Sequence, residues 1–461
     1  MRSKTKWICC LLFISLWLPF LSWGQGQVDT LISLRGAVQL SGERYPQLQA
    51  RKKEMEAATA HIAEVKYIKM PTLDVGYQAN LATANNLTGL FYPVGLLPMT
   101  GPPSSKNNYT PFTGSAASLL MNWQVISFGA QASQIHVAEA EANVKKRNVD
   151  EDVFQNSVQV ISSYLDVVLA QMNLRIHEQN IRRTEVNLRE SRVLAQSGIR
   201  PGVDTALFLC ERSKAKVGGL QASRELQTTQ WLLAQFLVVD QFPIPTDTAL
   251  LLRLPSSTSN GDSSFNSHPL MRLAQSQVAM SYSKEQFLKK SYLPKLTVFG
   301  TAFARGTGVG ADGDLKPGGG MGLSRYNYGA GFQISFPILK YGEVKRQLEV
   351  QHFLSEAAEK TLSQTGTELL TQQHISNTAF TSSISVAEET HRQLLAARYA
   401  YQAMNIRYTT RLVNLSDMVQ VQYNLFEAEL AERKAYWDAW KALLLQAAVT
   451  GNLQLFLNQI P

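Results

Sequence analysis

The segment Tyr326-Asn-Tyr-Gly-Ala-Gly-Phe-Gln-Ile-Ser-Phe-Pro-Ile338 decides how this chain folds, because its residues alternate between two chemical types. Aromatic or aliphatic side chains occupy every second position, and asparagine, glycine, glutamine, serine and proline fill the positions between them. Successive side chains of an extended strand point to opposite faces, so the segment predicts a strand with one apolar and one small, polar face. An apolar face outward and a polar face inward are typical of a barrel strand in lipid.

Three further segments alternate in the same way and predict three more strands. With the segment above, the expected strands run at about residues 72–83, 115–127, 295–305 and 326–339. The 295–305 strand is less regular, because Phe299 and Phe303 share a face with Thr297 and Thr301. Each run reaches the roughly 9–11 residues that a tilted strand needs to cross a membrane.

Two interpretations of these strands remain open at this point. A soluble antiparallel sheet with one solvent-exposed face has the same alternation as a membrane barrel. Four strands are too few to close a barrel, and open sheet edges are not tolerated in lipid. Either the strands are soluble, or several chains share one barrel. The loops at 84–113 and 306–325 are long and rich in Gly, Pro, Ser and Asn, which suits an outer-membrane barrel.

The chain also contains an internal duplication. Two motif pairs recur after 223 residues and a third recurs after 213, and such constant offsets indicate one duplicated unit with a longer loop in its first copy. The matching pairs are Tyr45-Pro46 with His268-Pro269, Pro71 with Pro294, and Val203-Asp204 with Ser416-Asp417. We therefore divide the chain into a first repeat, a connector and a second repeat, at residues 25–236, 237–267 and 268–461.

Each repeat contains one long interval that predicts a single helix. Residues 129–197 and 342–410 contain no proline, and their one internal glycine is Gly366. Each would be roughly 100 Å long as a helix, which suits a structure that spans a gap. Shorter helices are expected at 204–236 and 417–449, and another before the first strand of each repeat. Coiled-coil spacing runs through Phe154, Val158, Ile161, Leu165, Val168, Met172 and Ile176.

The N-terminus predicts export of the protein. Three cations within the first six residues precede a mostly apolar run from Trp7 to Trp23, which indicates a signal peptide over residues 1–24. The alternative is a membrane anchor, for which the run is short. Without these cations the chain has 41 basic and 36 acidic residues, a charge of +5 in place of +8. That charge is too weak and dispersed to indicate nucleic-acid binding. No later apolar stretch reaches the ~18 residues of a transmembrane helix.

Two smaller features complete the organisation of the chain. The proline-rich connector can hold a short strand at about 249–254. Cys9 and Cys10 leave with the signal peptide, so the mature chain keeps Cys210 alone. Because Cys210 shares a helical spacing with Leu207 and Val217, we expect it to be a packed helix position.

Catalysis and metal binding find little support in the sequence. The histidines form no i,i+4 pair and no acid-flanked cluster of the kind that binds zinc; they are His61, His136, His177, His268, His352, His374 and His391. The glycine-rich run at 318–322 lies between two strands rather than between a strand and a helix, so a phosphate site is not expected. We predict that the protein is no enzyme and has no cofactor or metal.

The order of these features resembles the outer-membrane efflux channel-tunnel family, often called TolC-like. The resemblance rests on the ordered set rather than on any one motif, and it covers nearly the whole mature chain in both repeats. It is carried by both aspartate turns and by His268-Pro269, Tyr292-Leu293-Pro294, Phe336-Pro337-Ile338-Leu339 and Tyr341-Gly342.

The resemblance implies a mainly α-helical fold with a membrane β-barrel portion. Three chains of four strands would make one twelve-stranded barrel, continued by twelve helices as a periplasmic tunnel, and such a homotrimer leaves no open sheet edge. The resemblance further implies contact with outer-membrane lipid, a periplasmic adaptor protein and an inner-membrane transporter, reached directly or through the adaptor. The implied function is a passive exit duct for small molecules across the periplasm and the cell outer membrane.

The two aspartate turns are the implied tunnel entrance and adaptor-docking tips. The family often has Gly-x-x-Ser-x-x-Asp there, and this chain has Gly198-Ile199-Arg200-Pro201-Gly202-Val203-Asp204 and Arg411-Leu412-Val413-Asn414-Leu415-Ser416-Asp417. The spacing holds, but Pro201 and Asn414 replace the serine and Arg411 replaces the second glycine. The implied docking residues are Gly198, Arg200, Pro201, Gly202, Leu412, Asn414, Leu415 and Ser416.

Charges at these turns imply a gate. Asp204 and Asp417 would contribute to an acidic ring at the mouth, which favours cations. Some family members have a second acid where this chain has Gln420, so we expect a weaker ring here. Arg411 is expected to pair with an acid and hold the mouth closed. The alternative is that the aspartates only stabilise the starts of their helices.

Two other functions remain open from the sequence. One is an outer-membrane duct for type I protein secretion, and the other is a structural coiled-coil surface protein. The alternating strands with polar faces and the matched repeat offsets favour a duct for small molecules.

Overall fold

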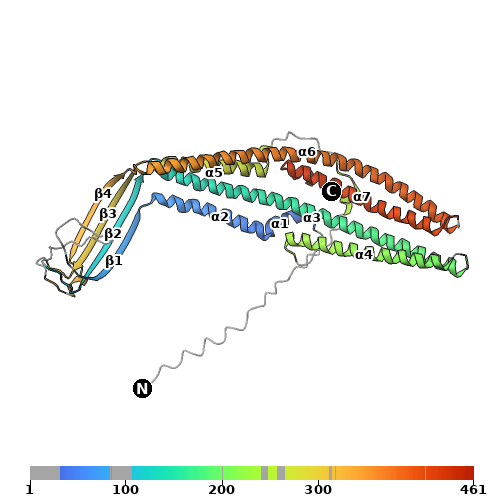
Figure 1. The fold of residues 1–461 in the computed structure, drawn as a ribbon, viewed down its shortest axis with the longest axis horizontal. Helices are drawn as coiled ribbons and strands as arrows, with labels where there is room; N and C mark the ends of the chain where they lie inside the picture. Colours follow the sequence, from blue (N-terminus) through green and yellow to red (C-terminus); the bar gives the residue numbers. More distant parts are fainter. Residues whose placement is uncertain are drawn as a thin grey trace, which may run out of the picture.

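The computed structural model describes residues 32–83, 85, 106–199, 201–239, 248–256, 265–310, 314–316, 318–410 and 412–460. The expected signal peptide, Arg200 and Arg411 lie outside these residues. The molecule is elongated, with a β-sheet at one end, two helical hairpin tips at the other and long helices between them (Figure 1). The fold is mainly α-helical, as predicted.

The described residues form one antiparallel sheet of four strands in the order β1-β2-β3-β4. The strands are β1 (Thr72–Ala82), β2 (Phe112–Ile126), β3 (Lys295–Thr307) and β4 (Arg325–Ser335). The last strand ends earlier than the expected 326–339, because Pro337 has no amide hydrogen for a ladder. Within this part of the chain, β1 and β4 have a strand partner on one side only.

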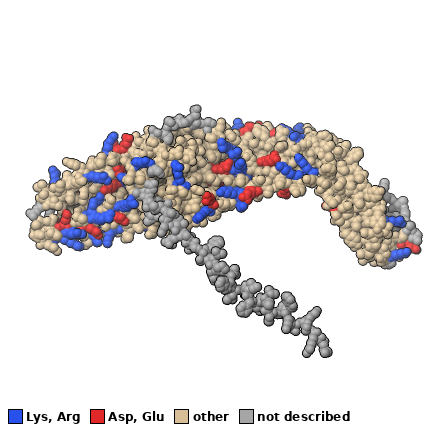
Figure 2. Space-filling view, turned by 180° about the vertical axis from the view of Figure 1, so that it is seen from behind, with Lys and Arg blue, Asp and Glu red and all other residues tan. Residues whose placement is uncertain are grey.

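The strand register gives the sheet two chemically different faces. Directly paired residues share a face. One series of pairs, which we call the apolar face, includes Leu73 with Met121, Tyr77 with Ala117, Val298 with Phe332 and Ala302 with Tyr328. The other series, the polar face, includes Gln78 with Ala116, Thr297 with Gln333 and Phe303 with Asn327. Lysine, arginine and acidic residues are sparse on the visible side of the sheet and gather at its far end (Figure 2).

Six helices form the body of the molecule. They are α2 (Pro46–Lys66), α3 (Ala130–Gln196), α4 (Gly202–Leu237), α5 (Pro269–Ser291), α6 (Lys340–Thr409) and α7 (Leu415–Val449). Helix α3 packs against α2, α4, α5 and α7, and α6 packs against α5 and α7. Near the sheet the lateral order is therefore α2-α3-α5-α6, and near the tips it is α4-α3-α7-α6 (Figure 1). Helices α4 and α6 are the outer helices of the tip half.

Local sequence explains where several helices begin. Pro46 and Pro269 occupy the first turns of α2 and α5, where a missing amide hydrogen costs nothing. The His268 side chain caps α5 by accepting a hydrogen bond from the amide of Leu270 at 3.1 Å. Gly129 has a φ of 91°, which glycine adopts without strain, and it turns the chain from β2 into α3.

The described chain also contains short elements that we did not predict, at both ends, in the connector and beside the sheet. They are α1 (Leu34–Arg44), α8 (Gln454–Leu457) and the 3₁₀ turns η1 (Tyr67–Lys69), η2 (Thr248–Leu252), η3 (Phe265–Ser267) and η4 (Gly319–Met321). The prediction of a short strand at 249–254 is wrong, because η2 lies there. Leu250 and Leu251 are both buried, and a helical turn allows this for adjacent residues that a strand would point to opposite faces.

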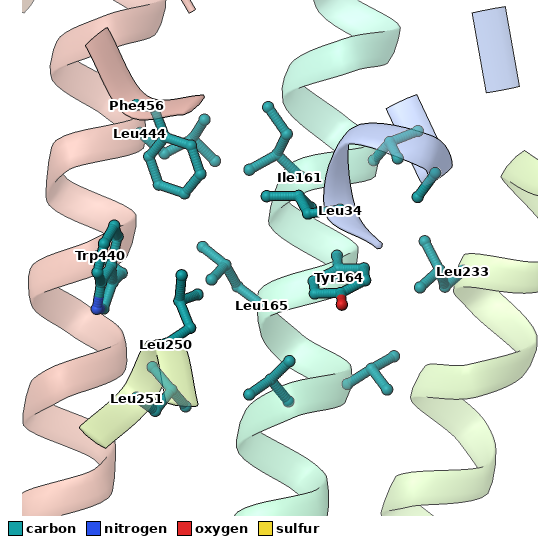
Figure 3. Close-up of a cluster of buried hydrophobic side chains, with 14 of the residues drawn as sticks. Leu34, Ile161, Tyr164, Leu165, Leu233, Leu250, Leu251, Trp440, Leu444 and Phe456 are labelled. Carbon is teal, nitrogen blue, oxygen red and sulfur yellow. The ribbon is translucent and has the colours of Figure 1, made fainter. Parts of the chain in front are cut away.

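The main hydrophobic core lies in the middle of the molecule. Ile161 and Leu165 of α3 face Trp440 and Leu444 of α7, and Leu233 of α4 closes the other side of α3 (Figure 3). Helices α1 and α8 and turn η2 add Leu34, Phe456, Leu250 and Leu251. Each fully buried side chain of this size contributes about 1.5–3 kcal/mol. Part of the predicted coiled-coil spacing on α3 is thus the core of the single chain.

Cys210 differs from the prediction of a packed position. It is exposed in the single chain, as are Leu207 and Val217 on the same helix. The surface of α4 that faces α3 carries Phe208, Ala215 and Leu226 instead.

None of the helices in the described ranges has a stretch long and apolar enough to cross a membrane.

Candidate functional site at the helix tips

The first tip joins α3 to α4 through a short turn. Gly198 has a φ of 69°, and Pro201 is the extended residue that precedes α4. Gly202 begins the helix, and Asp204 lies in its first turn, where the helix dipole favours a carboxylate. The exposed fraction of Asp204 is 8%, so this carboxylate lies in the packed tip. Arg200 falls outside the described residues.

The second tip has the same spacing and a different surface. Asn414 caps α7, since its side chain accepts a hydrogen bond from the amide of Asp417 at 2.9 Å. Asp417, Ser416 and Leu412 are exposed, whereas Leu415 is buried. Arg411, the residue expected to close the mouth, falls outside the described residues. The two aspartates therefore differ, because only Asp417 presents its side chain to solvent in the single chain.

Gln420 lies one helical turn beyond Asp417. Its side chain is exposed and donates a hydrogen bond from Nε2 to Oδ1 of Asn424 at 2.9 Å. The second turn of α7 thus offers amides where some family members have an acid.

A small apolar cluster holds the two tips together. Leu188 of α3, Phe208 of α4, Tyr408 of α6, and Leu415 and Met418 of α7 are all buried in it. The rings of Phe208 and Tyr408 meet edge to face at 6.0 Å between centroids. The tips are therefore packed as one unit within the chain.

A polar seam next to this cluster joins α3 to α7. Arg183 donates two hydrogen bonds to the carboxylate of Glu429, at 2.9 and 2.7 Å. Asn187 donates to Oε1 of Gln422 at 2.6 Å, and Gln422 donates to Asn180 at 3.4 Å. Bidentate, mostly buried arginine–carboxylate pairs hold one geometry, so the seam fixes the first hairpin against the second. Sequence reasoning missed these residues, because partners about 240 positions apart leave no local signal.

The described residues give no sign of a catalytic or metal centre. They contain no group of three or more His, Cys, Asp or Glu side chains that could hold a metal ion. Burial lowers the pKa of His177 and of His268, which favours their neutral forms. His268 serves the fold, since it caps α5 and donates from Nε2 to the carbonyl of Ala448 at 3.2 Å.

The chain has the fold of several solved membrane proteins, among them two outer membrane channels. The chain is similar to a membrane protein from Pseudomonas aeruginosa, with 14% identity and a TM-score of 0.74 over 92% of each chain. It is similar to the CmeC outer membrane channel of Campylobacter jejuni, with 12% identity and a TM-score of 0.73 over 94% of this chain and 90% of that one. It is similar to the MtrE outer membrane channel of Neisseria gonorrhoeae, with 16% identity and a TM-score of 0.71 over 91% and 89%.

No protein-family model and no curated protein sequence matches the chain. The structural likeness spans nearly the full length of both partners, so it covers the sheet, the long helices and the tips together. The resemblance predicted from the sequence is therefore confirmed at the level of the fold: the chain has the architecture of an outer-membrane channel subunit.

Proposed function

We propose that this protein is one subunit of a homotrimeric channel in the cell outer membrane. It is a passive exit duct for small molecules, driven by an inner-membrane pump through a periplasmic adaptor. The observation that carries the proposal is that the described residues form a sheet of four strands with one apolar face and an unpaired edge on each side. Such a sheet can lie in lipid only if these edges are paired, and further copies of the chain would supply the strands that pair them.

The edge strands support closure by identical copies. Strands β1 and β4 are each 11 residues long, so the edge of one copy matches the opposite edge of the next. The apolar face is strongly exposed at both edges, with 80% of Val75 and 93% of Tyr328 accessible. Aromatic and aliphatic side chains of this kind are typical of a barrel surface in lipid.

The outer helices support the same assembly. Helix α4 exposes Val203, Leu207, Val217, Leu220 and Trp231, and helix α6 exposes Phe353, Leu354, Ile375, Val386, Leu395 and Tyr399. Exposed apolar surfaces of this extent mark sites of association. Because α4 and α6 lie at opposite sides of the helical layer in the tip half, the tip half of α6 in one copy would pack against α4 of the next. The half of α6 near the sheet, with Phe353 and Leu354, would pack against α2 of the next copy.

The tips are the proposed entrance and docking surface. Exposed Asp417 would form the charged ring at the mouth, whereas buried Asp204 would chiefly support the first tip. Opening would separate the hairpins that Arg183, Glu429 and the tip cluster hold together. Exposed Leu412 offers an apolar contact for the adaptor. Leu412→Asp should then lower export from cells and leave the conductance of the purified channel unchanged, and unchanged export would remove Leu412 from the docking surface.

Planar-bilayer recording tests the duct itself. The purified mature protein should produce stepwise conductance increments, and an identical preparation from cells lacking the gene should produce none. A protein that gives no conductance and behaves as a single soluble chain in light scattering would contradict the proposal.

A further inference from the structure

The polar face of the sheet carries an unusual group of side chains near its far end. Phe299, Phe303 and Arg305 of β3 lie on this face, because they alternate with Val298, Ala302 and Ala304 of the apolar face. On one side each has a small cross-strand neighbour: Phe299 pairs with Gly331, Phe303 with Ser118, and Arg305 with Ala116. The two rings and the guanidinium therefore stand beside small residues on this face.

The three side chains are ordered relative to their surroundings. A Cβ atom at Gly331 would lie 2.8 Å from the ring of Phe299, so the ring lies over the backbone of β4 and requires glycine there. The Arg305 guanidinium lies 5.8 Å from the centre of the Phe303 ring, a cation–π distance. Along β3 the sequence of groups is thus ring, ring, cation toward the far end of the sheet.

A second arginine lies directly opposite the first. Arg305 pairs with Arg325 in the register of β3 and β4, and like charges placed directly opposite each other destabilise a sheet. Among the described residues neither arginine forms an ion pair. Asp74 is the one acidic residue in the four strands, and it lies toward the helical end, about 13 Å from Arg305 along the strand direction. Asp314, in the connection that follows β3, is the nearest acidic residue of the described chain beyond the strands. Within the polar face of the strands, this end therefore carries two arginines and no acid.

The described part of the connection between β3 and β4 lies on the side of the sheet opposite to this group. The connection packs on the apolar face, where the Ser115 hydroxyl donates to the carbonyl of Gly320 at 2.7 Å. Gly306, on the same face, has no room for a Cβ atom beneath Gly322. Arg305 itself remains exposed on the opposite face.

We infer that these residues form a binding belt for aromatic organic anions inside the outer mouth of the duct. The inference rests on the proposed trimer, in which the polar face lines the lumen and each group appears three times. Paired arginines recognise a carboxylate or similar anion, and the phenylalanine rings offer stacking to an aromatic body. The exported substrates that bind there would be amphipathic, with one aromatic part and one negative charge.

The test is block of the open channel by small carboxylates added to the external side. We expect 1-naphthoate to reduce the current of the wild-type channel at concentrations at least tenfold below those of acetate, which has a charge and no ring. The double variant Arg305→Gln/Arg325→Gln should lose this block by at least tenfold and shift ion selectivity toward cations. Phe299→Leu/Phe303→Leu should weaken naphthoate block and leave acetate block unchanged.

The matched control is Lys295→Gln, which removes a cation from the same face at the helical end of the strand and should leave naphthoate block unchanged. Each variant is first recorded in potassium chloride, so that a conducting channel establishes folding, and Arg325→Gln alone serves if the double variant does not insert. A wild-type channel that conducts but shows no preference for naphthoate, or variants with unchanged block, would overturn the belt and leave the duct intact. Absence of any wild-type conductance would overturn the duct and the belt with it.

Discussion

Around Leu165 and Trp440 the chain covers its own apolar side chains, whereas in the sheet and along α4 and α6 it leaves them exposed. The middle of the molecule therefore has the packing of an ordinary folded domain. The two ends leave apolar surface uncovered, and in the proposed trimer lipid and further copies of the same chain cover it. A substitution in the middle should lower the stability of each subunit, and one at the ends should block assembly or insertion.

The largest effect is expected in the middle, at Trp440. Trp440→Ala should lower the free energy of unfolding by about 3–5 kcal/mol. The change removes an edge-to-face contact with Phe456 at 5.6 Å and the hydrogen bond from Nε1 to the carbonyl of Arg253 at 3.1 Å. Denaturant unfolding followed by circular dichroism at one protein concentration measures this loss. The control Glu56→Ala, at an exposed position, should change the free energy of unfolding by less than about 0.5 kcal/mol. A similarly small loss in Trp440→Ala would contradict the view that the single chain forms its own core.

A charge on the apolar face should act on insertion rather than on the fold of the helices. Phe332 of the edge strand β4 pairs with Val298 on the apolar face, so Phe332→Arg should cost up to about 2–4 kcal/mol in lipid. Folding into lipid vesicles, followed by heat-dependent gel mobility, measures the defect. Gln333→Arg is the matched control, because it places the same charge on the next residue, whose side chain lies on the polar face. If Phe332→Arg and Gln333→Arg had equal insertion defects, the apolar face would not be the one that contacts lipid.

An acidic residue on an outer helix should separate the copies and leave each chain folded. Val217 is exposed on the side of α4 that faces away from α3, so Val217→Asp would bury an unpaired carboxylate between copies, at a cost of several kcal/mol. Cys210 lies on the same side and reports the separation by its reaction with a maleimide. We expect slow labelling in the assembled protein and labelling at least about tenfold faster in the variant. In the control Lys216→Asp, which changes an exposed residue on a neighbouring side of α4, Cys210 should be labelled as slowly as in the wild type.

The two tips should differ in their effect on ion selectivity. Asp417→Ala should lower the cation preference in single-channel recordings by at least about fivefold, since even one removed charge acts on a passing ion by roughly 1 kcal/mol at contact distance in water and the trimer loses three. Asp204→Ala should leave selectivity nearly unchanged, because Asp204 is buried in the tip. An unchanged cation preference in the Asp417 variant would exclude Asp417 from the filter.

The smallest expected effect is a pH dependence of the stability of the middle region, caused by His268. Burial lowers the pKa of His268, so its neutral form is favoured in the folded chain. The neutral His268 side chain therefore contributes to stability above the pKa of histidine in the unfolded state, about 6.5. This contribution is lost as the pH falls through the lower pKa of His268 in the folded state. The midpoint of unfolding should therefore drop more between pH 7 and 5 in the wild type than in His268→Asn, whose side chain can still cap α5. Parallel pH curves for the two proteins would contradict this role.

The sequence predicted the features that depend on local periodicity. Alternation placed Phe332 and Gln333 on opposite faces, and it placed Phe299 with Thr297, as the register shows. The absence of proline and internal glycine predicted the two longest helices, whereas the duplicated unit inferred from fixed offsets stays a prediction.

Features that depend on contacts between distant segments could not be predicted. The pair of Arg183 and Glu429 needs the rotation of two helices about their axes, which no local pattern specifies. Asp204 and Asp417 occupy equivalent positions in the sequence, and only the packing of the tips makes one buried and the other exposed. The 3₁₀ turn η2 exists because Leu250 and Leu251 both enter the core built by α3 and α7.

The central claim, that three copies complete what one chain leaves open, is tested most directly by the number of chains in the native protein. Native mass spectrometry of the mature protein extracted from membranes in detergent counts these chains without any variant. The account predicts a single species of three chains, which supplies a closed barrel from three four-stranded sheets. A protein found as one chain, or as an open series of oligomers without a preferred number, would contradict it.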